Sequence, residues 1–210
     1  MISDGHSCTH VGLSNVQKGA IGQYAFLAVA MATGKGQLEA YVPAADNEGR
    51  DAEVRRHLSR LGGIGIQIKV AFKTWRKPGR HYLEITIGVE QTRVQNDPRL
   101  WFLIGYYDVG CLGLHDPVCV VPASVLHMLV RRHIRSRQKT VTFHVSLDPD
   151  ARDEFSLYRV PLKDLGKRLL EIVDAQKLAP AAHFKAFPAD TILVGRRARQ
   201  RTPKRLRPAA

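Results

Sequence analysis

Hydrophobic and polar residues alternate most clearly in the segment GGIGIQIKVAF, residues 62–72. Read as a strand, this segment places its three isoleucines, Val70 and Phe72 on one face, because successive side chains point to opposite sides of a pleated chain. Gln67 and Lys69 then share the other face. An amide and an ammonium group in the middle of such an apolar strand are unusual, and they indicate a specific polar task.

The remaining pattern gives the order of elements along the chain. Ser14 and Gln17 have the spacing of a capping box, and the apolar residues that follow at helical spacing up to Gly34 predict a first helix. Strands are predicted at residues 37–43, 51–58, 63–72, 81–89, 100–110, 118–121 and 140–147. Two further helices are predicted at residues 122–139 and 160–177. Helices and strands in this mixture predict one α/β domain.

The net charge of +13 indicates a polyanionic partner. Residues 196–210 contain seven of the basic residues and no acid, so 13 minus 7 leaves a body of +6. They lack apolar periodicity and are interpreted as a mobile basic extension that tracks phosphates. The predicted organisation is an N-terminal extension at 1–13, a domain at 14–195 and a basic tail at 196–210.

Several other classes are disfavoured by the sequence. Three cysteines at irregular spacing favour reduced thiols over a disulfide scaffold. The chain shows neither a signal-peptide pattern nor a long apolar span, so a cytoplasmic protein without a membrane partner is expected. His6, Cys8 and His10 do not have a usual zinc spacing, and the glycine-rich segments do not form a nucleotide-binding fingerprint.

The Gln-x-Lys face gains a partner from the preceding strand. Asp51 lies 16 residues before Gln67, and a hairpin between the two strands brings its carboxylate beside that face. The resulting set is the Asp51 carboxylate, the Gln67 amide oxygen, the Ile68 carbonyl and the Lys69 ammonium. Such oxygen ligands suit Mg²⁺ or Mn²⁺, which leave positions to water and substrate phosphate. The set predicts a metal site for phosphodiester hydrolysis.

The order of these residues resembles the PD-(D/E)XK nuclease superfamily. A helix with the step Gly22-Gln23, then Asp51, then Gln67-Ile68-Lys69 is similar to the Mrr-like, restriction-endonuclease-like branch that carries Gln-x-Lys in place of Glu-x-Lys. The resemblance covers roughly residues 14 to 125. It implies a mixed central sheet flanked by helices, a metal held by Asp51 and the oxygens of Gln67 and Ile68, and a catalytic Lys69 that positions or activates the attacking water.

This resemblance implies a Mg²⁺-dependent DNA endonuclease of restriction, defence or repair, acting as a homodimer or with a partner subunit. The expected nucleic-acid contacts are Lys73, Arg76, Lys77, Arg131, Arg132, Arg135 and Arg137. Arg50 stands where the motif has proline, and Gln23 and Gln67 stand where it often has glutamate. Asp46, Glu48 or Glu84 would have to supply further negative charge. The alternative is a catalytically inactive nucleic-acid-binding or assembly module of the same fold.

Overall fold

The structure, a computed structural model, describes residues 12–43, 50–59, 62–77, 80–88, 97–135 and 138–178. All of them belong to the first of two compact units, residues 1–178. The helices are α1 (Asn15–Thr33), α3 (Ala123–His133), α4 (Leu165–Leu178) and the short 3₁₀ turns η1 (Ser156–Tyr158) and η2 (Leu162–Asp164). The strands are β1 (Leu38–Tyr41), β2 (Ala52–Arg56), β3 (Ile64–Ala71), β4 (Thr74–Lys77), β5 (Arg80–Gly88), β6 (Leu100–Asp108), β7 (Gly113–Leu114), β8 (Val118–Pro122), β9 (Thr140–Ser146) and β10 (Arg159–Val160).

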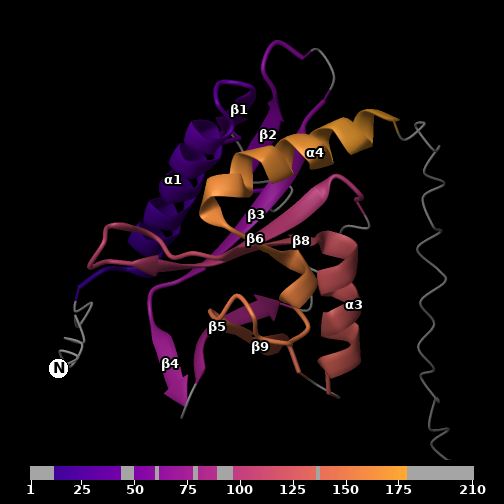
Figure 1. Cartoon of the computed structure of the whole chain (residues 1–210). Coiled ribbons are helices and arrows are strands. Elements are labelled where there is room, and N and C mark those ends of the chain that lie inside the picture. Colours follow the sequence, from indigo (N-terminus) through magenta and orange to yellow (C-terminus); the bar gives the residue numbers. More distant parts are fainter. Residues whose placement is uncertain are drawn as a thin grey trace, which may run out of the picture. The chain divides into compact units, whose positions relative to one another are not determined.

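A large mixed sheet forms the centre of this unit (Figure 1). Its strand order is β1-β2-β3-β6-β8-β10, with β7 attached to β6. Strands β1, β2 and β3 form an antiparallel meander, whereas β3 and β6 run parallel, with Gln67 opposite Phe102. Strand β3 therefore lies between an antiparallel and a parallel neighbour, near the middle of the sheet.

Two hydrophobic clusters lie on opposite faces of the large sheet. Helices α1 and α4 cover one face and pack with Ile64 and Ile66 of β3. The small antiparallel sheet β4-β5-β9 and helix α3 pack against the other face, where Phe102 of β6 is buried. Figure 1 shows α4 running across the sheet beside α1, and α3 beside β5 and β9. The alternating side chains of β3 therefore face two different layers, the α1 and α4 helices on one side and the small sheet with α3 on the other.

Helix α1 begins with the predicted capping box. The Ser14 side chain accepts a hydrogen bond from the Gln17 backbone N–H, and the Gln17 side chain accepts one from the Ser14 N–H. These two bonds satisfy donors that the first turn of a helix leaves without intrahelical partners. At the other end, the Thr33 hydroxyl accepts a bond of 2.8 Å from the Gly166 N–H of α4. The end of α1 is thereby fixed against the start of α4.

The predicted fold class is confirmed, since the chain is a mixed α/β protein with helices flanking a central sheet. The prediction for residues 122–139 was wrong at its end, because α3 stops at His133 and Ile134 is extended. The pattern also failed to give β4 and the separate small sheet, so one flank of the large sheet is partly β structure. The prediction for residues 160–177 holds from Leu165, after the 3₁₀ turn η2.

Some predictions fall outside the described residues. These include the extension up to residue 11, the turn at 44–49 with Asp46 and Glu48, and the basic tail at 196–210. The domain boundaries placed at residues 14 and 195 stay predictions. Within the described residues, no helix is both long and apolar enough to cross a membrane.

Candidate active site

Asp51 lies immediately before β2 and contacts the middle of β3. Its backbone N–H donates to the Ile66 carbonyl at 2.9 Å, and its carboxylate Oδ2 accepts a bond of 2.6 Å from the Ile68 N–H. The register pairs Ala52 with Ile66, so extending it by one residue places Asp51 opposite Gln67. The structure therefore brings Asp51 to the Gln-x-Lys segment, as the predicted hairpin requires.

The Ile68 backbone explains why a carboxylate is placed here. Strand β2 begins at Ala52, so the ladder supplies no β2 carbonyl for the Ile68 N–H, and the Asp51 side chain accepts from it instead. The N–H and C=O of one strand residue point to the same side, as they do in an antiparallel hydrogen-bonded pair. The Ile68 carbonyl consequently points to the same side of β3 as the Asp51 carboxylate. Two of the three predicted metal ligands share one side of the strand.

Gln67 and Lys69 lie on the face of β3 opposite the isoleucines. Gln67 is only 7% exposed, and it and His127 are the polar residues that are buried in the described part of the chain. The Gln67 amide atoms are not among the buried side-chain atoms of the described residues that lack a hydrogen-bond partner, and Lys69 beside it is half-buried. Gln67 is therefore a largely buried polar residue on the same strand face as Lys69, as the strand alternation predicts.

Gln23 of α1 connects the helix to Asp51. Its side-chain Nε2 donates a hydrogen bond to the Asp51 backbone carbonyl. The preceding residue, Gly22, is buried against β3, and a Cβ atom built there would lie 2.9 Å from Val70 Cβ. Gly22 therefore permits the close approach that lets Gln23 reach the backbone of Asp51. The Gly-Gln step that suggested the resemblance thus has a positioning role.

We expect Gln23→Glu to destabilise the protein at neutral pH, because an ionised carboxylate cannot donate to the Asp51 carbonyl. Loss of the bond should lower the free energy of unfolding by roughly 1–3 kcal/mol, which urea denaturation can measure. Below about pH 4.3 the protonated glutamate regains a donor, so the difference from the wild type should shrink. Equal stability of the two proteins at pH 7 would contradict this contact.

Arg50, the residue in place of the motif proline, crosses β3 beside Asp51. Its aliphatic side chain lies over Gly65, where an added Cβ would be 2.6 Å from Arg50 Cδ. Its guanidinium Nη2 then forms an ion pair of 2.8 Å with Asp97 Oδ2, just before β6. Arg50 thus connects the segment before β2, which carries Asp51, to β3 and to the residues just before β6.

The donor set around Asp51 fits a hard divalent cation held with few protein ligands. Asp51, Gln67 and Ile68 offer oxygen donors only, and Mg²⁺ commonly binds one or two carboxylates while keeping several waters. No group of three or more His, Cys, Asp or Glu side chains in the described residues is arranged to hold a metal. Glu84 does not supplement the site, because it pairs with His144 at 3.2 Å on the outer face of the small sheet.

The cysteines of the described part offer no competing chemistry. Burial raises the pKa of the Cys119 thiol to about 12, so this group stays protonated at neutral pH. The charge of Asp108 raises the pKa of the exposed Cys111 thiol. Because the thiolate is the reactive form, neither residue is suited to act as a nucleophile.

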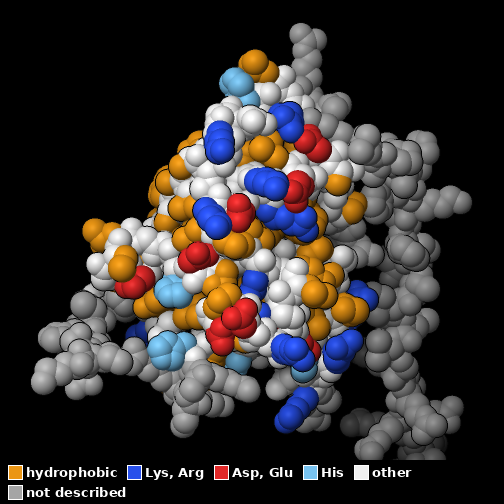
Figure 2. All heavy atoms as spheres, in the orientation of Figure 1, with side chains coloured by type: hydrophobic (Ala, Val, Ile, Leu, Met, Phe, Trp, Pro, Cys, Tyr) orange, Lys and Arg blue, Asp and Glu red, His pale blue; other side chains and the backbone are white. Residues whose placement is uncertain are grey.

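The predicted nucleic-acid contacts separate into two groups. Lys73 is exposed between β3 and β4, and Arg76 and Lys77 belong to β4. Arg131, Arg132 and Arg135 are exposed at the end of α3, where Arg132 lies 3.9 Å from Glu154, and Arg137 is outside the described residues. In Figure 2 basic side chains gather over the lower end of α3. The first half of β5, Arg80–Leu83, pairs with β4, and its last residue, Gly88, pairs with Thr140 at the start of β9. The β4 group therefore lies at one end of β5, and the α3 group precedes the strand that begins at the other end.

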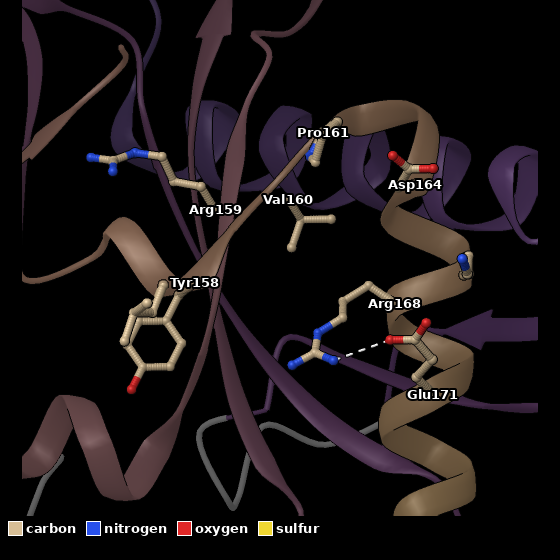
Figure 3. Close-up of a pocket in the computed structure, with 9 residues that line it drawn as sticks. Tyr158, Arg159, Val160, Pro161, Asp164, Arg168 and Glu171 are labelled. Atoms are coloured by element: carbon tan, nitrogen blue, oxygen red, sulfur yellow. Dashed lines mark hydrogen bonds and ion pairs between the residues drawn. The ribbon is translucent and has the colours of Figure 1, made fainter. Parts of the chain in front are cut away.

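A shallow pocket elsewhere on the unit is not part of this site. It has a volume of about 330 Å³ and lies between the segment Leu157–Pro161 and the start of α4. Figure 3 shows Arg168 paired with Glu171 at 3.1 Å, and the guanidinium of Arg159 directed away from Tyr158 and Arg168. Its lining includes three basic and two acidic residues, and it contains none of the predicted site residues.

Comparison with solved structures finds chains of similar structure. No family model matches the sequence, and no curated protein matches it. One similar structure is a bacterial homing endonuclease. That protein, I-Ssp6803I, aligns with a TM-score of 0.46 and 18% sequence identity, over 78% of this chain and 96% of that chain.

The sequence reasoning missed two contacts of the site region. Asp97 received no role in the site from the sequence, yet it pairs with Arg50. Gln23 was read as a substituted metal ligand, whereas its amide donates to the backbone of Asp51. The apolar residue pattern contains no signal for either contact, because both join segments that are distant in sequence.

Proposed function

We propose that this protein is a metal-dependent endonuclease that hydrolyses phosphodiester bonds of DNA at the site formed by Asp51, Gln67, Ile68 and Lys69. The observation that carries the proposal is the contact between Asp51 Oδ2 and the Ile68 N–H at 2.6 Å, which sets a carboxylate beside the Gln-x-Lys strand. Gln67 supports it, since it is one of the two polar residues buried in the described part of the chain and belongs to the same strand. The sequence resemblance to PD-(D/E)XK nucleases supplies the reaction class.

Each residue has a defined part in this proposal. Asp51, the Gln67 amide oxygen and the Ile68 carbonyl would hold Mg²⁺ or Mn²⁺. When bound, the ion supplies charge stabilisation at the phosphate and lowers the pKa of a coordinated water. Lys69 contributes a compact positive charge on the same strand face as Gln67, where it can orient the attacking water or the phosphate. Gln23 and Arg50 hold the backbone and neighbourhood of Asp51 in place.

The direct test is conversion of supercoiled plasmid DNA to nicked or linear forms by the purified full-length protein. We expect cleavage with Mg²⁺ or Mn²⁺ and none with a chelator. Binding of the ion to the folded protein should also raise the melting temperature as its concentration increases. A protein that shows neither cleavage nor a metal-dependent melting temperature would contradict the proposal.

A specific observation also favours the alternative of an inactive nucleic-acid-binding module. Gln67 is an amide, and the described residues contain no acidic cluster that would strengthen a metal site. Such a module would bind DNA equally well with Mg²⁺ or with a chelator and would leave plasmid intact. The plasmid assay and the metal titration together separate the two functions.

A further inference from the structure

The small sheet has one buried face and one outward face. Leu83, Ile85 and Phe143 belong to its buried face, which packs against the large sheet and α3. Residues directly opposite each other in an antiparallel pair share a face, and faces alternate along each strand. Trp75 lies opposite Tyr82, next to the buried Leu83, so both rings belong to the outward face.

Three aromatic rings gather on this outward face. Trp75 is 54% exposed, and the Tyr82 ring stacks on His144 with centroids 4.8 Å apart and an interplanar angle of 26°. We call Trp75, Tyr82 and His144 the aromatic face. Single exposed apolar residues are common on protein surfaces, but an exposed tryptophan directly opposite the tyrosine of a stacked pair offers a ring surface to a ligand.

Basic residues adjoin the aromatic face in the sequence. Lys73 is exposed just before β4, and residues 73–80 contain four basic residues and no acidic one. Glu84, an acid on the outward face, is paired within that face, because its Oε1 lies 3.2 Å from His144 Nε2. Exposed rings together with a basic segment match the requirements of a nucleic-acid strand, whose bases stack and whose phosphates need cations.

We propose that the aromatic face binds single-stranded DNA by stacking unpaired bases on Trp75 and on the Tyr82–His144 pair. This inference rests on the proposed function and adds the form of its substrate, DNA with an unpaired segment next to the cleavage site. In a duplex the faces of the bases are hidden in the stack, and only base edges and phosphates can be reached. Rings displayed on an open sheet are suited to splayed bases instead.

The aromatic face is close to the candidate active site along the chain. Strand β4 follows β3 after two residues, so Trp75 lies six residues beyond Lys69, a span of at most about 20 Å. A single strand that stacks on the aromatic face can therefore extend towards Asp51 and Lys69. Lys73, between the two, is positioned to contact the phosphates of the connecting nucleotides.

The two tryptophans of the chain permit a direct test. In Trp101→Phe, Trp75 is the only tryptophan, and its fluorescence reports on the aromatic face. The full-length variant is titrated with oligothymidylate of roughly 12 nucleotides, about one binding site, and with duplex of equal length, both in chelator so that cleavage plays no part. We expect the single strand to quench the emission and the duplex to leave it largely unchanged.

Fluorescence anisotropy with labelled oligothymidylate gives the affinities of the variants. Trp75→Ala should weaken binding roughly 5- to 150-fold, the range for losing one base stack, while Trp75→Phe should retain most of the affinity. Tyr24→Ala is the control, because Tyr24 is an exposed ring on α1, 64% exposed against 54% for Trp75, and its loss should have no effect. Lys73→Ala should make the slope of the logarithm of the binding constant against the logarithm of the salt concentration shallower by about 0.7.

Two results would overturn the inference. One is equal quenching by single strand and duplex, and the other is unchanged affinity of Trp75→Ala for oligothymidylate. Both measurements are made without metal, so they do not depend on cleavage. A protein that cleaves duplex DNA but fails these tests would support the proposed function and contradict the role of the aromatic face. A protein that passes these tests but cleaves no DNA would support the aromatic face and contradict the proposed function.

Discussion

Asp51→Asn is expected to reduce plasmid cleavage by at least about 100-fold, because the site loses its one assigned negative charge and with it several kcal/mol of metal-derived stabilisation. Asparagine keeps a side-chain oxygen that can accept from the Ile68 N–H, now 2.6 Å from Asp51 Oδ2. The fold should therefore persist, with a melting temperature close to that of the wild type. Initial rates of plasmid nicking at saturating Mg²⁺ measure the effect.

Two companion variants separate charge from structure. Asp51→Ala removes the acceptor as well, and should lose roughly 1.5–3 kcal/mol of stability in addition to activity. Asp108→Asn is the matched control, since Asp108 accepts the Gly110 N–H at 2.8 Å in a turn and should tolerate the same change. Cleavage by Asp51→Asn at the wild-type rate would exclude Asp51 as the metal ligand.

Lys69→Met tests the second half of the same site. Methionine retains the length and packing of the partly buried lysine stem but removes its positive charge. Turnover should stop, while the rise in melting temperature with Mg²⁺ should remain, because Lys69 is not a proposed ligand. A variant that loses the metal response together with activity would show that Lys69 acts on metal binding instead.

Gly166→Ala is expected to destabilise the protein strongly. A Cβ atom at this position would lie 2.2 Å from the Gly34 backbone N and 2.5 Å from the Thr33 carbonyl carbon. Those atoms belong to the backbone at the end of α1, so no side-chain rotation can relieve the clash and α4 must move. Overpacking of this kind costs about 1–3 kcal/mol or more, which corresponds to a melting temperature lower by roughly 2–12 °C.

Gly19→Ala provides the opposite control. Gly19 is an exposed position within α1, and a Cβ atom there would meet no other atom within 4 Å. Alanine should stabilise the helix by roughly 0.5–1 kcal/mol, because glycine loses more backbone entropy on folding. If Gly166→Ala melted at or above the wild-type temperature, the close contact between α1 and α4 would be incorrect.

The features of the candidate site that depend on residues close in sequence were predicted, and those that depend on distant residues were not. The two-residue period of β3 was sufficient to place Gln67 and Lys69 on one face, because strand alternation is a local geometric property. Bringing Asp51 to that strand needed only a hairpin. The contact from Gln23 to Asp51 spans 28 residues, and the Arg50 to Asp97 pair spans 47. Their formation depends on how whole elements pack.

The small sheet depends almost entirely on contacts between residues that are distant in sequence. Strand β4 consists of Thr-Trp-Arg-Lys, which lacks the alternating apolar residues that mark a strand. Its turn signal, Pro78-Gly79 in the sequence, was the available clue to a hairpin with β5. The pairing of β5 with β9 joins segments about 60 residues apart, as the Glu84 to His144 contact shows. Periodicity does not specify such partners.

The sequence by itself determined the first helix with its capping box, most strands, the α/β class, and the shared face of Gln67 and Lys69. Each of these follows from spacing within one segment. Only the tertiary structure decided that β6 lies parallel beside β3, that β4, β5 and β9 form a separate sheet, and that Gln23 reaches Asp51. These features are set by long-range burial and hydrogen bonding, which compensate for closing long loops and have no local signature.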